Sequence, residues 1–186
     1  IRDRLFPTPQ HKNLVICVSG IGASKDFSTI ITDSIPCLDL VEKSQCFPLY
    51  WYDNSEAEII DLFNQGSKNE MDRYVRRDGV TDWILDTARK QYGYKVTKED
   101  IFYYVYGLLH SPEYRTEFAT DLKKSLPRLP LVEKADDFWA FSKAGRELAN
   151  LHLNYETIEP YKKCNILYAP FTNKGDRINY HVEKMR

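Results

Sequence analysis

Hydrophobic and polar positions divide the chain into a β-rich beginning, a helical middle and a β-rich end. Asn13–Ser19 (NLVICVS) is a short apolar run rich in β-branched residues, which predicts a buried strand. Further strands are predicted over Phe27–Thr32 (FSTIIT), Leu38–Val41 and Phe47–Tyr52 (FPLYWY). Because Pro48 cannot donate to a strand ladder, it places its strand at a sheet edge or near a strand start. These segments predict a small, mostly antiparallel sheet.

The middle of the chain has helical periodicity with recognisable start and stop signals. A helix is predicted over Val80–Gln91 with Gly93 as its stop. Thr97–Asp100 resembles a capping box at the start of a second helix. The apolar stripe behind this start consists of Ile101, Tyr104, Val105, Leu108 and Leu109.

Two further helices are predicted after these. Ser111-Pro112-Glu113 combines an N-cap, a proline at the first position and an acid, and Tyr114, Phe118 and Leu122 follow at a spacing of four. Leu126–Pro130 contains two prolines and predicts an extended connector. Asp136 or Asp137 is expected to cap a last long helix that ends near Asn154. Its predicted buried residues are Phe138, Phe141, Leu148 and Leu151.

The end of the chain returns to strand patterns. Cys164–Tyr168 and Ile178–Val182 are predicted strands around a hairpin-like loop at Phe171–Arg177, and we expect them to rejoin the first sheet. Residues 53–72 are polar and predict a linker, with some helix near Glu56–Phe63. The predicted fold class is therefore α+β, a small sheet from both chain ends packed with a helical lobe of about four helices.

These patterns also predict domain boundaries. Residues 1–60 and 160–186 form the predicted β-rich lobe, and residues 61–159 form the predicted helical lobe of the same domain. The chain begins with Ile1 and not with Met, as expected of a fragment of a longer polypeptide.

Composition limits the possible functions. The chain has 186 residues, 42% of them hydrophobic, which is enough to bury a core. Its formal net charge of −1 argues against a protein that coats nucleic acid through bulk charge. The four cysteines form no CxxC motif and fit reduced thiols in a cytoplasmic protein. No apolar run is long enough to span a membrane, so we expect no membrane partner.

Catalytic and metal-binding motifs are missing from the sequence. There is no phosphate-binding GxxxxGK[ST] loop, no GxSxG elbow and no histidine or cysteine spacing that fits zinc. No pair of prolines occurs, so the loop typical of amino-methyltransferases is absent. His110 and His152 lie near predicted helix ends, where capping or packing is the default role. We therefore assign no catalytic and no metal-binding residue.

Polar and basic residues in three segments are candidates for contacts with DNA. Ser24 and Lys25 follow Gly20-x-Gly22, a pattern that favours a plain loop over a dinucleotide site, and their hydroxyl, ammonium and backbone N–H groups suit phosphates or base edges. The second candidate set is Arg73, Arg76 and Arg77, which act either as a phosphate clamp or as a solvated surface paired with nearby acids. The third set is Asn173, Lys174 and Arg177, whose side chains match adenine and guanine edges.

A further basic group follows the third predicted helix. Lys123, Lys124 and Arg128 either complement the C-terminal dipole of that helix or touch a backbone phosphate, and we favour the dipole. The aromatic residues Phe102, Tyr103, Tyr104 and Tyr106 have helical spacing, which favours packing over base stacking.

Four long blocks carry a family resemblance. They are SGIGASKDFSTIITDSIPCLDL (19–40), SQCFPLYWY (44–52), EDIFYYVYGLLHSPEYRTEFATDLKKSLPRLPL (99–131) and FWAFSKAGRELANLHL (138–153). In this order they resemble the C-terminal specificity domain of type ISP restriction-modification enzymes and of related adenine-specific methylases. The blocks look like scaffold, so the resemblance assigns no catalytic and no base-reading residue.

The resemblance implies a DNA target-recognition domain that is not itself an enzyme. It implies a parent chain with an adenine-N6 methyltransferase, a helicase-like ATPase and an endonuclease, to which S-adenosylmethionine, ATP and Mg²⁺ would belong. The implied partners are double-stranded DNA and the methyltransferase domain, into whose pocket a target adenine is flipped. The alternative is a structural domain that docks or couples the methyltransferase to the motor with little direct base readout. A third reading, a small enzyme, has no clustered candidate groups.

Overall fold

The computed structural model describes residues 2–54 and 74–159. The chain divides into two compact units, Ile1–Glu156 and Thr157–Arg186, and every α-helix and strand described below belongs to the first. The predicted strands Cys164–Tyr168 and Ile178–Val182 lie outside the described residues. The predicted division into two lobes therefore stays a prediction, as does the part of the sheet expected from the end of the chain.

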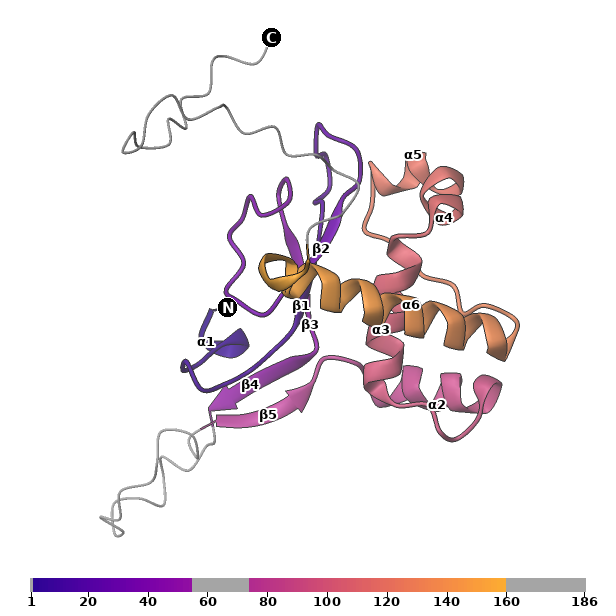
Figure 1. Ribbon diagram of the computed structural model, residues 1–186, viewed down its shortest axis with the longest axis horizontal. Helices are drawn as coiled ribbons and strands as arrows, with labels where there is room; N and C mark the ends of the chain where they lie inside the picture. Colours follow the sequence, from indigo (N-terminus) through magenta and orange to yellow (C-terminus); the bar gives the residue numbers. More distant parts are fainter. Residues whose placement is uncertain (1, 55–73, 160–186) are drawn as a thin grey trace, which may run out of the picture. The chain divides into compact units, whose positions relative to one another are not determined.

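A three-stranded antiparallel sheet lies near the beginning of the chain. Its strands β1 (Val15–Val18), β2 (Thr29–Thr32) and β3 (Gln45–Pro48) have the order β2-β1-β3, so the central strand is the most apolar one (Figure 1). All four residues of β1 are buried, as expected for a run of β-branched residues and cysteine. The prediction of a buried strand, and of an edge strand containing Pro48, is confirmed.

The predicted strand over Phe47–Tyr52 is two strands in different sheets. After β3 the chain turns at Leu49 into β4 (Tyr50–Asn54), which pairs with β5 (Tyr74–Asp78) in a separate antiparallel ribbon. Leu49 bridges the two sheets, since its N–H donates to Leu14 O at 2.7 Å and its carbonyl accepts from Gly79 N at 2.7 Å. A continuous apolar run such as FPLYWY does not reveal such a break.

A second strand prediction is wrong. Leu38–Val41 is a turn, and Leu38 is 69% exposed. The turn is closed by Ser44, whose hydroxyl donates to Val41 O at 2.8 Å and accepts from Val41 N at 3.0 Å. Side-chain bonds of this kind compete with a strand ladder.

The first two predicted helices are confirmed with their caps. Helix α2 (Asp82–Tyr92) starts at Thr81, whose side chain accepts from Ile84 N, and it ends at Gly93, where φ is +104°. Helix α3 (Lys98–Leu109) starts with a complete capping box between Thr97 and Asp100. Both starts follow from residues that satisfy the free N–H groups of the first turn.

The third predicted helix is interrupted. Ser111 caps α4 (Pro112–Glu117) as expected, but the backbone leaves helical geometry at Phe118, and a single turn, α5 (Ala119–Leu122), follows. An extended segment over 126–130 comes next, as the two prolines predict.

Helix α6 (Ala135–Leu153) is the long last helix, and a 3-10 turn, η3 (Tyr155–Thr157), follows it. Its N-cap is Lys134 without a side-chain bond, so the expected cap by Asp136 or Asp137 is wrong, and both acids lie in the first turn. The buried residues of α6 are Phe138, Ser142, Gly145 and Ala149, whereas the predicted core residue Leu151 is 47% exposed. Small residues thus form most of the face that packs on α3 (Figure 1).

The core lies between the three-stranded sheet and α3. Ile16 and Val18 of β1 belong to the same buried cluster as Phe102 and Leu109 of α3. A hydrogen bond also joins the sheet to α3, because the Tyr106 hydroxyl accepts from Ile31 N of β2 at 3.2 Å. The short helix α1 (Arg2–Leu5) contacts β4 through the buried Asn13, which donates to Leu5 O and Tyr50 O. The α+β class predicted from the sequence is confirmed.

Candidate nucleic-acid interface

The predicted DNA-contacting residues fall into described and undescribed parts of the chain. Ser24 and Lys25 lie in the connection between β1 and β2, and Arg76 and Arg77 lie on β5. Arg73, Asn173, Lys174 and Arg177 lie outside the described residues, and their roles stay predictions. The two described pairs lie apart, since Figure 1 shows β5 and the β1–β2 connection at different ends of the first unit.

The donors of the Ser24–Lys25 loop already bind a carboxylate. Glu42 Oε1 accepts from Ser24 N at 2.7 Å, and Oε2 accepts from Lys25 N at 2.9 Å and from Ser24 Oγ at 3.1 Å. These backbone N–H groups lower the pKa of Glu42, because they stabilise its charged form. The backbone groups that we expected to be free for phosphate are therefore occupied, and the Lys25 side chain remains exposed.

The two glycines of this loop serve its backbone. A Cβ at Gly20 would stand 2.2 Å from Lys43 O, so only glycine fits the close approach of the turn at residues 38–44. Gly22 has a φ of +72°, and its carbonyl accepts from Lys43 Nζ at 2.7 Å. Strand β2 follows the loop. These contacts favour the plain loop that the sequence suggested over a dinucleotide site.

Arg76 and Arg77 point to opposite faces of the β4–β5 ribbon, as neighbours on a strand must. The guanidinium of Arg76 lies over the ring of Tyr50, 4.3 Å from its centroid. Arg77 instead forms an ion pair with Asp53, with Nε 2.7 Å from Oδ2, and Arg4 binds the other carboxylate oxygen at 2.6 Å. The two arginines lower the pKa of Asp53, chiefly through the Arg4 hydrogen bond. Asp53 lies far from Arg77 in the sequence, and the pairing of β4 with β5 that brings them together cannot be read from sequence spacing.

Lys123 has a partner that sequence reasoning missed. Its Nζ lies 3.1 Å from Asp26 Oδ1, so the segment after α5 contacts the β1–β2 connection. Because α5 is only a single turn, the helix dipole that we favoured as the partner of Lys123 and Lys124 is small. A long-range ion pair leaves no local signal in the sequence.

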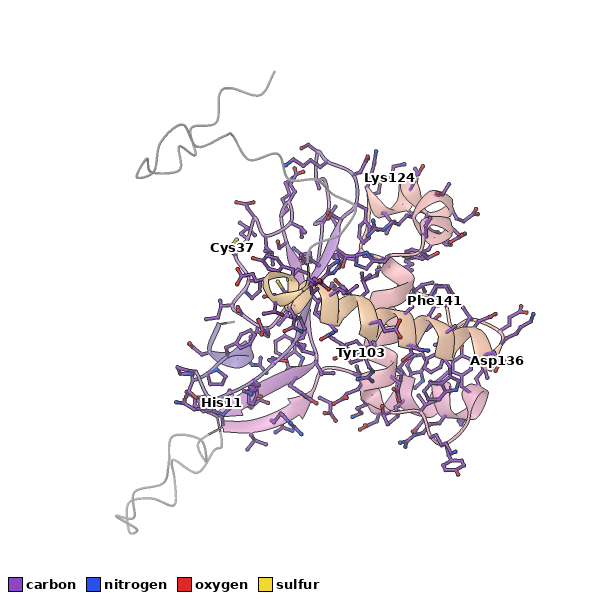
Figure 2. All side chains as sticks on the ribbon, in the orientation of Figure 1. His11, Cys37, Tyr103, Lys124, Asp136 and Phe141 are labelled. Atoms are coloured by element: carbon purple, nitrogen blue, oxygen red, sulfur yellow. The ribbon has the colours of Figure 1, made fainter. Side chains whose placement is uncertain are left out.

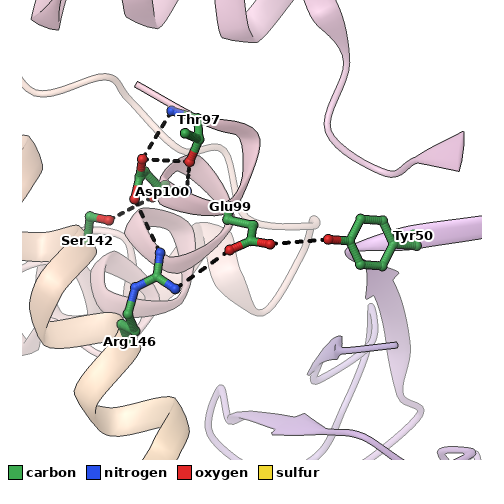
Figure 3. A network of polar contacts seen from close by, with 6 residues as sticks. All are labelled: Tyr50, Thr97, Glu99, Asp100, Ser142 and Arg146. Carbon is green, nitrogen blue, oxygen red and sulfur yellow. Dashed lines mark hydrogen bonds and ion pairs between the residues drawn. The ribbon is translucent and has the colours of Figure 1, made fainter. Parts of the chain in front are cut away.

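A polar network joins the ribbon to the helices (Figure 3). Glu99 accepts from the Tyr50 hydroxyl at 3.2 Å and lies 3.8 Å from Arg146, which also pairs with Asp100 at 3.2 Å. The Asp100 carbonyl accepts from Ser142 on α6. Arg146 also stacks on Tyr103, 4.1 Å from its centroid. Each side chain in this network has a hydrogen-bond or ion-pair partner within it, as expected of contacts that hold the ribbon and the helices together.

The histidines at the helix ends pack against α3, as predicted. His110 is the C-cap of α3, and its ring meets that of Tyr106 edge-on at 4.7 Å. His152 Nδ1 shares a 2.5 Å hydrogen bond with the Tyr106 hydroxyl. Burial lowers the pKa of His110 to about 4, helped by the charge of Arg115 and by His152.

The pockets on the first unit differ in the polarity of their lining residues. One pocket, of about 700 Å³, is lined by aromatic, acidic and basic side chains, among them Tyr50, Glu99 and Lys12. A second, of about 220 Å³, is lined by apolar residues of β1, β3 and α3. Among the described residues, no cluster of side chains is suited to hold a metal ion, and no helix has the length and hydropathy to cross a membrane.

Comparison with known protein families gives one match. The model of the Type ISP C-terminal specificity domain matches residues 1–186. A search of curated proteins gave no match.

Three of the solved structures that match are complexes with DNA or with a DNA substrate mimic. The chain is similar to part of DrdV in the cryo-EM structure of a DrdV–DNA complex, with 35% identity, a TM-score of 0.70 and 86% of this chain covered. It is similar to part of the ATP-dependent Type ISP restriction-modification enzyme LlaBIII bound to DNA, with 31% identity, a TM-score of 0.69 and 87% covered. A nuclease-deletion mutant of the Type ISP enzyme LlaGI, in complex with a DNA substrate mimic, matches with 32% identity, a TM-score of 0.58 and 83% covered. The chain spans only 14%, 10% and 11% of these three chains.

Proposed function

The chain belongs to the Type ISP C-terminal specificity domain family, and from this premise we propose that it recognises the DNA target of a restriction-modification enzyme. One observation carries the proposal: the family match covers the whole chain, and two of the similar solved structures are Type ISP restriction-modification enzymes in complex with DNA or a DNA substrate mimic. The domain is a specificity domain and not a catalytic one.

Recognition requires a rigid scaffold that presents polar groups to base edges and phosphates. This rigidity comes from the capped helices, from the polar network around Arg146 and from the β4–β5 ribbon. A two-stranded ribbon has a width that the major groove admits. Among the described candidates, the side chains of Lys25 and Arg76 are exposed and have no carboxylate partner in residues 2–54 and 74–159, so we propose both as DNA contacts.

The parent enzyme is part of the same proposal. We propose that a methyltransferase domain in the same chain modifies adenine at N6 with S-adenosylmethionine, and that ATP and Mg²⁺ serve an ATPase and an endonuclease there. The ATP dependence stated for LlaBIII supports this composition. In this arrangement the specificity domain holds the duplex while the target adenine is flipped into the neighbouring pocket.

A second candidate function is docking to the methyltransferase or the motor. It is favoured by exposed aromatic residues around α2, where Trp83 is 73% and Tyr94 is 81% exposed. Exposed aromatic side chains are typical of surfaces that bind another protein.

Exchange of the domain separates the two functions. The parent enzyme would receive the corresponding domain of LlaBIII in place of this chain, and methylated adenines would be mapped by sequencing. If this domain recognises DNA, the methylated sequence changes to that of the donor. If it only docks, the hybrid methylates the original sequence, and that result contradicts target recognition. Retained methylation of any sequence is the control for a folded hybrid.

A further inference from the structure

Three segments that are far apart in the sequence meet beside the β1–β2 connection. The turn at residues 38–44 contacts the connection through Gly20 N, which donates to Glu42 O at 3.0 Å, and through Lys43 Nζ, which donates to Gly22 O. The segment after α5 reaches it through the ion pair between Lys123 and Asp26. Figure 2 labels Lys124 at this end of the unit.

Each of the three segments contributes lysines. Lys25, Lys43, Lys123 and Lys124 are all exposed, and we call them the lysine surface. The nearby acids are Asp26 on the β1–β2 connection, Asp39 and Glu42 on the turn, and Asp121 on α5, so the four lysines do not outnumber them, and the surface is distinguished by the exposure of its lysines. The side-chain ammonium groups of Lys25 and Lys124 have no carboxylate partner among the described residues.

Asp26 and Glu42 differ in how many hydrogen bonds and ion pairs hold their carboxylates. The Glu42 carboxylate binds three donors from Ser24 and Lys25, which fixes the loop. The Asp26 side chain is 93% exposed, and its one described partner is Lys123, itself 58% exposed. An exposed pair of this kind contributes at most about 1 kcal/mol and exchanges readily for another anion.

We propose that the lysine surface binds backbone phosphates of the target DNA and that Asp26 competes with these phosphates for Lys123. The proposal rests on the proposed function, which supplies DNA as the ligand. A lysine ammonium is a flexible point charge, whereas the planar guanidinium of arginine can form two hydrogen bonds with guanine. The lysine surface therefore supplies affinity and orientation through phosphates. Specificity would come from other residues.

Two single variants give effects of opposite sign. Lys123→Ala and Asp26→Asn both break the Lys123–Asp26 pair, so a purely structural role of this contact would shift DNA binding in the same direction. If Lys123 binds phosphate, Lys123→Ala weakens binding by roughly three- to tenfold, since one counterion-releasing contact is lost. Asp26→Asn strengthens binding by roughly two- to fivefold, since Lys123 is released from its exposed partner.

The measurement is the Kd of the full-length parent enzyme for a 30-bp duplex, determined by fluorescence anisotropy over a series of salt concentrations. One duplex contains the target sequence found by methylation mapping, and a second has that sequence scrambled. The double variant Lys123→Ala, Lys124→Ala should weaken binding to both duplexes by the same factor, about tenfold or more, and lower the slope of log K against log salt by about 2. Loss on the target duplex alone would show base reading and overturn the phosphate assignment.

A matched control removes the same charge elsewhere. The double variant Lys90→Ala, Lys95→Ala changes two exposed lysines, one in the last turn of α2 and one in the segment after it, and should leave the Kd within about twofold. An equal loss in this control, an unchanged salt slope in the first variant, or weaker binding by Asp26→Asn would each overturn the proposal. The domain exchange tests the proposed function separately. If the exchange transfers the target sequence but the lysine variants bind DNA normally, the domain recognises DNA and only the role of the lysine surface is contradicted.

Discussion

Gly107 of α3 and Gly145 of α6 face each other where the two helices cross, with no room for a side chain on either. A Cβ added at Gly145 would stand 2.0 Å from Tyr103 O and 2.7 Å from Gly107 N, and one added at Gly107 would stand 2.4 Å from Phe141 O. The backbones therefore pack directly on each other. This crossing sets the distance between the helix that packs on the sheet and the helix that carries Arg146.

The Gly145→Ala variant is expected to destabilise the fold despite the higher helix propensity of alanine. The new methyl group must separate α3 from α6, which costs about 2–4 kcal/mol, more than the about 1 kcal/mol gained from propensity. Urea unfolding followed by circular dichroism measures the difference. The control Ala144→Leu adds a larger group on the exposed face of α6 and should change the free energy of unfolding by no more than about 0.5 kcal/mol. Equal stability of Gly145→Ala and the native chain would show that the helices can move apart freely.

Local signals predict a large part of this fold. The caps at Thr97 and Ser111 and the stop at Gly93 depend on side chains that act within one turn, so they are visible in the sequence. The buried strand around Ile16 is equally local, because its whole length is apolar. These elements are the ones that the structure confirms.

The features that were missed depend on contacts between distant segments. The face of α6 that packs on α3 contains Ser142, Gly145 and Ala149, which hydrophobic periodicity does not register, so the stripe ending at Leu151 was preferred. The break at Leu49 exists because Gly79 and Leu14 bind its backbone. At the candidate interface, the residue types were predictable, but the carboxylates that hold Arg77 and the Ser24 loop come from elsewhere in the chain.

Acid should destabilise the chain through His110. The pKa of His110 is lowered from 6.5 to about 4 in the folded state, chiefly by burial and then by Arg115 and His152. Between these two values the unfolded chain binds the proton and the folded chain does not, so stability falls as pH falls from about 6.5 to about 4. Between pH 7 and pH 5 we expect a loss of about 1–2 kcal/mol from this residue, measured as a lower urea midpoint.

The His110→Phe variant serves as the control for this pH effect, because it keeps a ring against Tyr106 and removes the titrating group. Its urea midpoint should change less between pH 7 and pH 5 than that of the native chain. Glu42 and Asp53 have lowered pKa values in the folded state, so their contributions are lost at more acidic pH. An equal pH dependence in both chains would exclude His110 as the cause.

The described cysteines should differ in reactivity. Cys17 and Cys46 lie opposite each other on β1 and β3, with their sulfur atoms 3.7 Å apart. Burial and the neighbouring Cys46 raise the pKa of Cys17 to about 12, which suppresses the reactive thiolate. Cys37 is exposed and should react first with iodoacetamide at pH 8, as read by peptide mass spectrometry. Cys37→Ser should abolish the fast labelling at this position without accelerating that of Cys17, and equally fast labelling of Cys17 would show that β1 is accessible.

The two arginines of β5 should contribute unequally to DNA binding. Arg76 lies over Tyr50 and has no carboxylate partner among the described residues, whereas Arg77 shares Asp53 with Arg4. Arg77 could bind a phosphate only by breaking its ion pair with Asp53, whereas Arg76 has no such ion pair to break. Arg76→Ala should therefore weaken binding of the parent enzyme to duplex DNA by roughly fivefold, and Arg77→Ala by no more than about twofold. Anisotropy titrations on one duplex compare the two variants, and thermal melts check that both remain folded. If neither variant changes the Kd, the β5 arginines are the solvated, ion-paired surface that the sequence left open. If Arg77→Ala raises the Kd more than Arg76→Ala does, the ion pair with Asp53 orients Arg77 toward DNA, and the expectation that it keeps Arg77 from binding DNA is wrong.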